Sequence, residues 1–324
     1  MALDFPDSPV NGQIFAGYTY VGATGTWRAP SRETLSGLSD INSIVRKNRT
    51  SLQYFSSGWN AVYDYKILDI VRIFGSVSSE NNQDFNFADY PEATALFIQA
   101  QAGGAGGGGA AATSASNSVG ASGGAGEYSE LFLDITNPEW LRDTANPLGG
   151  NYSIGDRVPS SVTMRAGAGG AGGLAGLAGG AGTDSYFWRE SSQEYWCGAE
   201  GGSAGAGGAS LATNRYLAGG AGGNEPFSGG GAFNVADYSV AGGAGESVMI
   251  LGATTVNLAH SGRGGMSVHS GGAAAVVRNT AGSSSGIAAS GYGGGGSGGV
   301  GTGTQAGATG GAGTPGFVFV TVLG

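Results

Sequence analysis

The chain has 324 residues, of which 68 are glycine, and 23 acidic against 14 basic residues give a formal net charge of −9. Lysine occurs only at Lys47 and Lys66. With no basic patch to contact phosphates, nucleic acid and anionic membranes are poor partners, and we expect neither. The single cysteine, Cys197, excludes an internal disulfide framework and a multi-thiolate metal site.

The beginning of the chain carries no secretory signal pattern. Met1 is followed by ALDFPDSPV, which holds neither a basic segment nor an apolar one. No apolar stretch approaches the roughly 20 residues that cross a bilayer. We therefore expect a soluble protein made in a cytosol, with no membrane insertion. Disorder is the alternative for so much glycine and serine, but 13 tyrosines, 13 phenylalanines and 5 tryptophans favour an ordered fold.

The chain divides into three predicted domains. Residues 1–35 form the first, where alternation in QIFAGYTYV predicts a small β-hairpin that serves as an attachment module. Residues 36–92 form a connecting and oligomerisation region. Residues 93–324 form a glycine-rich domain in which glycine runs alternate with inserts of ordinary composition.

The connecting region carries two local patterns. Leu35, Leu38, Ile41, Val45 and Leu52 are spaced roughly as one face of a helix. The sequence AVYDYKILDIVRIF at 61–74 is typical of a β-strand. We therefore expect a short helix followed by a strand.

Glycine recurs at every third position of residues 166–182, AGAGGAGGLAGLAGGAG. A polyproline II-type helix has about three residues per turn and no internal hydrogen bonds, so its backbone groups need partners outside the helix. Glycine at every third position lets neighbouring backbones approach. The run, about 50 Å long if extended in this way, is predicted to be one rod of a bundle. The glycines assigned to this scaffold are Gly167, Gly170, Gly173, Gly176, Gly179, Gly182, Gly307, Gly310, Gly313 and Gly316.

The predicted fold class is mostly irregular and β. It is a bundle of glycine-rich polyglycine II-type helices with short flanking β-strands and a small N-terminal hairpin and helix region. Because ordering glycine is entropically costly and alanine buries little apolar surface, backbone hydrogen bonds must supply much of the stability.

The inserts between glycine runs carry the candidate binding residues. The segment 183–197, TDSYFWRESSQEYWC, concentrates aromatic side chains directly after the regular glycine run. Aromatic side chains on a rigid loop suit sugar stacking or contacts with a protein. The alternative is that they form a small core that caps the bundle. The candidate receptor-binding residues are Tyr186, Phe187, Trp188, Arg189, Tyr195, Trp196, Tyr216, Phe227, Phe233 and Tyr238.

Motifs for chemistry are weak throughout the chain. Gly167–Gly172 fits G-x-G-x-x-G, but more glycine follows where a dinucleotide fold needs a helix. The two histidines, His260 and His269, are too few for a structural zinc site. Cys197, beside Trp196, is expected to be a half-buried apolar residue. We expect no catalytic residues, no metal and no cofactor.

Several joints in the chain resemble a known family. ALFIQAQAGGAGGGG is a strand that enters glycine, GGAGEYSELFLDI is glycine that returns to a strand, and GGAGTPGFVFVTVLG closes the chain on a strand. This order resembles the glycine-rich domain of bacteriophage tail-fibre and tail-tip adhesins. The opening FPDSPVNGQIF also resembles a hairpin module of phage fibre proteins. The same order is similar to that of the glycine-rich adhesins at the tips of T-even-like long tail fibres. The N-terminal zone of this chain differs from theirs, and the mode of attachment is therefore left open.

The resemblance implies a non-catalytic virion adhesin, made in the host bacterial cytoplasm. It would bind a bacterial surface glycan or outer-membrane protein through loops on the glycine-rich bundle. Residues 1–92 would contact other virion proteins, and the chain would be a homotrimer. A purely structural virion component is the main alternative. A glycine-rich antifreeze protein is a weaker one, since it predicts an export signal and disulfides.

Overall fold

A computed structural model describes residues 66–113, 116–135, 161–189, 194–208, 215–223, 238–253 and 256–324, and six short strands before them. The chain forms two compact units, Met1–Lys66 and Ile67–Gly324, which are treated separately below. The sequence NPEWLRDTANPLGGNYSIGDR at 137–157, with two prolines, predicts a long loop, and it lies outside the described residues.

The first unit contains two three-stranded antiparallel sheets. The predicted hairpin in QIFAGYTYV is confirmed by the pairing of its first two strands. The predicted helix is wrong where the structure describes it, because Val45 and Leu52 lie on paired strands and oppose each other in the ladder. Their spacing of seven therefore comes from a hairpin rather than from a helical face. The strands are β1 (Ile14–Phe15), β2 (Tyr18–Val21), β3 (Thr26–Arg28), β4 (Ile44–Lys47), β5 (Thr50–Phe55) and β6 (Gly58–Tyr63).

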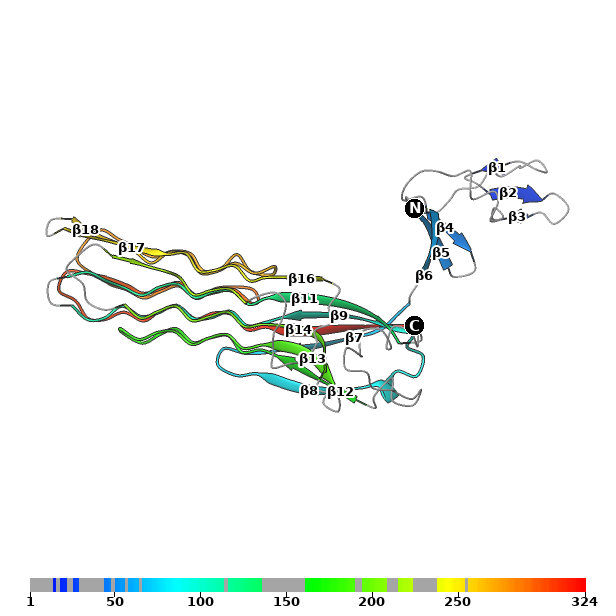
Figure 1. Ribbon diagram of the computed structural model, residues 1–324, viewed down its shortest axis with the longest axis horizontal. Helices are drawn as coiled ribbons and strands as arrows, with labels where there is room; N and C mark the ends of the chain where they lie inside the picture. The colour runs from blue at the N-terminus through cyan, green and yellow to red at the C-terminus, as the bar shows by residue number, and fades with distance from the viewer. Residues whose placement is uncertain are drawn as a thin grey trace, which may run out of the picture. The chain divides into compact units, whose positions relative to one another are not determined.

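The second unit is built on a β-sandwich of a five-stranded and a four-stranded sheet (Figure 1). The five-stranded sheet has the order β16-β11-β9-β22-β7, and the four-stranded sheet has the order β14-β13-β12-β8. All their strand pairs are antiparallel. The first sheet comprises β7 (Ile67–Phe74), β9 (Ala95–Gln101), β11 (Tyr128–Asp134), β16 (Tyr238–Val240) and β22 (Phe317–Leu323). The second comprises β8 (Asn81–Asn86), β12 (Ser161–Ala166), β13 (Ser185–Arg189) and β14 (Glu194–Ala199).

Alternating apolar residues explain why these segments form a sandwich. Successive side chains of a strand point to opposite faces, and β9, β11 and β22 alternate fully buried with half-buried positions along their length. A single 3₁₀ turn, η1 (Phe87–Asp89), follows β8 and contributes Phe87 to the edge of the core. Both sheets supply the core, which includes Ile73, Phe85, Leu96, Ile98, Leu131, Leu133, Val162, Met164, Phe187, Trp196, Val318, Val320 and Val322.

The glycine runs leave the sandwich as extended segments that continue its strands (Figure 1). Residues 103–110, which follow β9, donate their backbone N–H groups in turn to three neighbouring segments, 177–183, 308–314 and 121–124. Each neighbour is reached at every third residue, for example by Gly104, Gly107 and Ala110 toward 308–314, at 2.8–2.9 Å. These bonds satisfy backbone groups that would otherwise be buried without partners.

The predicted fold class is nevertheless wrong. Among the described residues the regular structure is almost entirely strand, and the turn η1 is the one helical segment there, so the chain is a β-sheet protein and not a bundle of polyglycine II helices. The physical reason is that the strand segments, and not the glycine runs, carry the apolar side chains that can form a core. Alternating Leu, Ile, Val and Phe residues bury their side chains between sheets, whereas glycine and alanine offer little area to a core. No helix among the described residues has the length and apolarity to cross a bilayer.

The regular run 166–182 is also not one straight rod. Its chain turns at Ala175–Leu177, where Gly176 has a left-handed φ of 77°. The two halves then pair with each other, with Gly180 N donating to Ala171 O at 2.8 Å and Thr183 N to Ala168 O at 3.0 Å. The run is therefore two antiparallel segments, about half the predicted length each.

The other scaffold glycines lie where backbones meet. A Cβ on Gly170 would overlap the carbonyl oxygen of Gly180, and one on Gly313 would overlap that of Gly104. The same holds at Gly167, Gly173, Gly179, Gly182, Gly310 and Gly316, while at Gly307 the overlapping atom is the Cβ of Ala175.

Two small sheets stand at the end of the second unit away from the sandwich (Figure 1). They share an apolar cluster of Val119, Val248, Ala259 and Val300. One sheet has the order β10-β21-β20 and the other β15-β17-β18-β19. The strands are β10 (Ser118–Val119), β15 (Arg215–Leu217), β17 (Val248–Ala253), β18 (Val256–His260), β19 (Val277–Arg278), β20 (Gly282–Ser284) and β21 (Val300–Thr302).

Candidate functional site

The outer face of the five-stranded sheet carries a continuous row of half-buried and exposed side chains. Strand register places Arg72, Phe319, Gln99, Glu130 and Tyr238 side by side, one from each of β7, β22, β9, β11 and β16. Neighbouring strands are about 4.8 Å apart, so the row is roughly 19 Å long. The alternate residues of the same strands point into the core. The sandwich therefore presents one aromatic and polar face to solvent.

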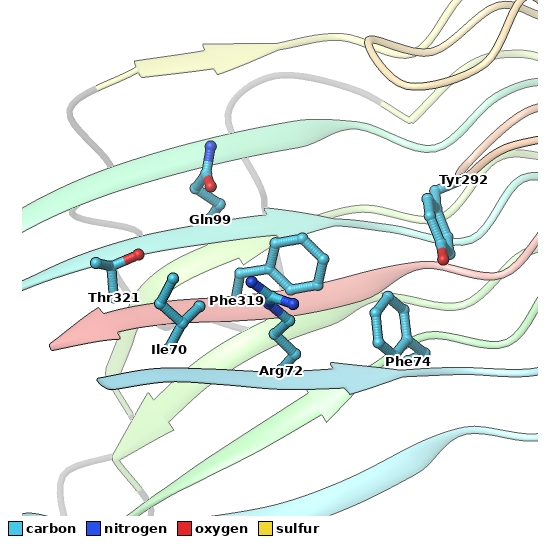
Figure 2. Close-up of a pocket in the computed structure, with 7 residues that line it drawn as sticks. All are labelled: Ile70, Arg72, Phe74, Gln99, Tyr292, Phe319 and Thr321. Carbon is cyan, nitrogen blue, oxygen red and sulfur yellow. The ribbon is translucent and has the colours of Figure 1, made fainter. Parts of the chain in front are cut away.

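An open cavity of about 320 Å³ lies on this face (Figure 2). Seven residues line it, and they come from three adjacent strands and from one distant glycine run. They are Ile70, Arg72, Phe74, Gln99, Tyr292, Phe319 and Thr321. We call this set the sheet-face cavity. Its residues include one basic and no acidic side chain.

Aromatic rings form one side of the sheet-face cavity. Phe74 stacks on Tyr292 with ring centroids 5.5 Å apart, and it meets Phe319 edge-on at 5.4 Å. Phe319 in turn stacks on Phe317 at 4.2 Å. Phe74 remains 40% exposed although it takes part in these contacts. An apolar ring that stays open to solvent on a rigid strand is available to a ligand.

Arg72 reaches across the cavity from the edge strand β7. Its guanidinium carbon lies 5.8 Å from the centroid of the Phe319 ring, a cation–π distance. Figure 2 shows the side chain extended over the sheet toward that ring. The side chain is exposed, so the edges of the guanidinium face solvent.

Gln99 is held at the other side of the cavity by its neighbours on β11. Its Nε2 donates to the Tyr128 hydroxyl at 2.6 Å, and that hydroxyl donates to Glu130 Oε1 at 2.5 Å. Burial and the hydrogen bond to the Glu130 carboxylate raise the pKa of Tyr128 above its ordinary range. Tyr128 therefore stays neutral and keeps donating at any physiological pH.

Tyr292 is placed over the sheet by a turn within a glycine run. Gly291 and Gly293 on either side have left-handed φ values of 84° and 73°. A second turn supports it, because Ser267 Oγ donates to Tyr292 O at 2.5 Å and Tyr292 N donates to His269 O at 3.3 Å. Burial against this face lowers the pKa of His269.

The predicted aromatic insert 183–197 is a core hairpin rather than a loop at a tip. It forms strands β13 and β14 of the four-stranded sheet. Phe187 has no exposed surface and Trp196 is 5% exposed, and both belong to the sandwich core. A side chain without exposed surface cannot contact a receptor, so these two assignments are corrected. Burial follows from strand alternation, which sends Phe187 inward.

The neighbouring candidates on this hairpin point the other way. Tyr186 and Trp188 are half-buried and lie edge to face, with ring centroids 5.9 Å apart. Arg165 donates to the Tyr186 hydroxyl at 3.1 Å and also pairs with Glu80. Tyr186 is thus part of a structural network on the outside of the four-stranded sheet.

The remaining candidates are dispersed. Tyr216 on β15 is 72% exposed and Tyr238 on β16 is 55% exposed, and Tyr238 ends the row that contains Arg72. The side chains of Arg189 and Tyr195 lie outside the described residues, as do Phe227 and Phe233 entirely.

None of the residues considered for chemistry lines the sheet-face cavity, although His269 accepts a hydrogen bond from the backbone of Tyr292, which does. His260 Nδ1 accepts from Gly262 N at 3.1 Å, while His269 packs between Tyr128 and Phe317. Cys197 is fully buried, not half-buried as predicted. Gly167–Gly172 hydrogen-bonds to other glycine runs. Within the described ranges, no group of three or more His, Cys, Asp or Glu residues could hold a metal ion.

Sequence reasoning missed the sheet-face cavity. Two local signals were present. Phe319 takes an outward position in the alternating FVFVTVL, and Tyr292 is a lone aromatic residue in a glycine run. The strand order that joins them with Phe74 is not written in any local pattern. No protein-family model matches this chain, and no curated protein matches it in sequence.

Proposed function

We propose that this protein is a non-catalytic virion adhesin that binds a bacterial surface glycan or outer-membrane protein. The observation that carries the proposal is the sheet-face cavity, where one exposed arginine, one exposed ring and two half-buried rings line the same open space. Aromatic and arginine side chains dominate recognition surfaces because they combine large contact area with directional polar groups. The resemblance of the strand–glycine–strand joints to phage tail-fibre and tail-tip adhesins supports the same function.

The hydrogen-bonded glycine runs suit this role because they hold a binding residue in place. Binding is weakened when side chains or loops must be ordered on contact. Here Tyr292 lies between two glycine turns that are tied to neighbouring segments by backbone hydrogen bonds of 3.0–3.3 Å. The rings of the cavity are therefore positioned before any ligand arrives.

In this proposal the first unit, residues 1–66, attaches the chain to other virion proteins. The rest of the predicted attachment region, residues 67–92, includes strands of the sandwich and supplies Arg72 and Phe74 to the cavity. The assembled protein is a homotrimer on a tail fibre or another appendage. Three linked copies would raise the strength of weak single-site contacts by effective concentration. A purely structural virion component is the alternative, and it predicts no affinity for any cell.

The proposal is tested by binding of the fluorescently labelled full chain to a panel of bacterial strains. Deletion of residues 183–197 is unsuitable because it removes core strands. Tyr238→Ser changes an exposed side chain in the row on the sheet face, and Tyr216→Ser changes an exposed side chain of another sheet; both leave the core intact. We expect strain-selective binding that Tyr238→Ser weakens and that the control Tyr216→Ser leaves unchanged. Folded protein that binds no strain would contradict the adhesin and favour the structural role.

A further inference from the structure

We infer that the sheet-face cavity binds a saccharide that carries a carboxylate, such as a uronic or a sialic acid. The inference rests on the proposed function, and it names the class of ligand and the residues that receive it. Phe74 and Tyr292 supply the stacking surface, Arg72 takes the carboxylate, and Gln99 and Thr321 face the hydroxyl groups. All five residues line the one cavity (Figure 2).

The aromatic side of the cavity fits the apolar face of a sugar ring. A pyranose presents axial C–H groups on one face, and these pack on flat aromatic rings that stay partly exposed. Phe74 and Tyr292 are 28° from parallel with centroids 5.5 Å apart, and Phe74 is 40% exposed. The cavity is open to solvent and has a volume of about 320 Å³, so a ligand bound there can be one unit of a longer chain.

Arg72 selects for a negative group. A planar guanidinium binds a carboxylate through two parallel N–H groups while its flat face covers an aromatic ring. Arg72 already covers Phe319, at 5.8 Å, and no acidic side chain lines the cavity to neutralise it. Glu130, on the same row, is separated from Arg72 by the intervening Phe319 and Gln99, and it is hydrogen-bonded to Tyr128.

Charge on the whole chain limits the kind of anion. With a net charge of −9, the protein repels a dense polyanion at long range, and only the local field of Arg72 favours a negative ligand. A glycan that is mostly neutral, with isolated acidic units, avoids the long-range repulsion and still offers a carboxylate to Arg72. Nucleic acid and sulfated polymers do not.

The test measures binding of the full chain to methyl glucuronide and to N-acetylneuraminic acid by ligand-observed NMR. The matched neutral probes are methyl glucoside and the amide of methyl glucuronide. We expect the amide to bind at least about tenfold more weakly than the acid. The difference should shrink at high salt, because the contact to Arg72 is screened at an exposed site.

Three variants locate the site. Arg72→Gln should lose about tenfold affinity for the acidic probes and leave the neutral ones unchanged, whereas Phe74→Ser should weaken both classes. Arg263→Gln removes the same charge from an exposed arginine that does not line the cavity, and it should match the wild type. Circular dichroism and the thermal midpoint report whether each variant is folded.

The outcomes separate the inference from the proposed function. Strain binding that Arg72→Gln leaves unchanged, with no preference for acid over amide, overturns the inference and keeps the adhesin. Binding of the acidic probes that Arg72→Gln abolishes, without binding to any strain, keeps the site and contradicts the adhesin on that panel. If Phe74→Ser instead changes the sedimentation of the protein, the face is an interface between copies, and the inference is wrong.

Discussion

Single glycines decide whether the glycine runs between the sandwich and the two small sheets can pack together. A Cβ on Gly313 would overlap the carbonyl group of Gly104 in the adjacent run, and a Cβ on Gly104 would overlap that of Gly294 in a third run. Since backbone cannot be moved as cheaply as the end of a side chain, one methyl group forces two segments apart. The hydrogen bonds between them, Gly104 N to Thr314 O among them, would lengthen together.

We therefore predict that Gly313→Ala lowers the free energy of unfolding by about 1–3 kcal/mol or more. Gly271 is the matched control, because a Cβ there has nothing within 4 Å. Gly271→Ala should be neutral or stabilise by up to about 1 kcal/mol through the unfolded chain. Denaturant unfolding of both variants checks this, and equal effects would show that backbone contact is not what selects glycine.

Asp184 makes stability depend on pH. Burial raises its pKa above the ordinary value, against the effect of a hydrogen bond from Gly201 N at 2.9 Å. A carboxyl group with a raised folded-state pKa contributes stability below its unfolded pKa, and that contribution is lost as pH rises through the folded value.

Asp184→Asn should therefore gain stability relative to wild type as pH rises from about 4 to about 7, because the variant has no charge to bury. Its side-chain oxygen can still accept from Gly201 N. Urea unfolding of both proteins at the two pH values gives the double difference, in which other titrating groups cancel. A constant difference between the proteins would refute the assignment.

At the scale of elements, the aromatic hairpin β13–β14 shows how alternation separates core from surface. Phe187 packs on Phe85 and Trp196 with centroids 5.7 and 5.9 Å away. The preceding and following aromatic residues face outward. Aromatic residues that are close in the sequence are therefore divided between the core and the outer face of the sheet.

We predict that Phe187→Ala destabilises the protein by about 3–5 kcal/mol, as expected for a large buried ring. Tyr216→Ala, which truncates a ring that is 72% exposed, should change stability by less than about 0.5 kcal/mol. Thermal and denaturant unfolding measure both. A small effect of Phe187→Ala would mean that the hairpin is not part of the cooperative core.

Elements were predictable from sequence to different degrees. The strand joints ALFIQAQ, YSELFLD and FVFVTVL are strands in the structure because their alternation has one interpretation. The helix predicted from Val45 and Leu52 is two strands, since sparse apolar residues fit a hairpin as well as a helical face. The turn at Gly176 lies inside an unbroken triplet pattern, so spacing alone could not place it.

At the scale of the molecule, both apolar clusters found among the described side chains belong to the second unit. A chain of residues 67–324 should accordingly fold by itself and unfold within a few degrees of the main transition of the full chain. Differential scanning calorimetry of the two chains is the measurement. A shorter chain that is unfolded or melts far lower would show that residues 1–66 contribute to the stability of this unit.

The sequence by itself determined that the apolar residues of the sandwich strands alternate, and that the glycine runs bring backbones together. These properties follow from local chemistry, namely side-chain period and the absence of a Cβ. Only the tertiary structure decided which run neighbours which, because glycine and alanine segments offer nearly identical partners. It also decided the sheet-face cavity, since Phe74, Tyr292 and Phe319 meet only through pairing of the chain's distant parts. That face, and not the aromatic insert, is where recognition is proposed.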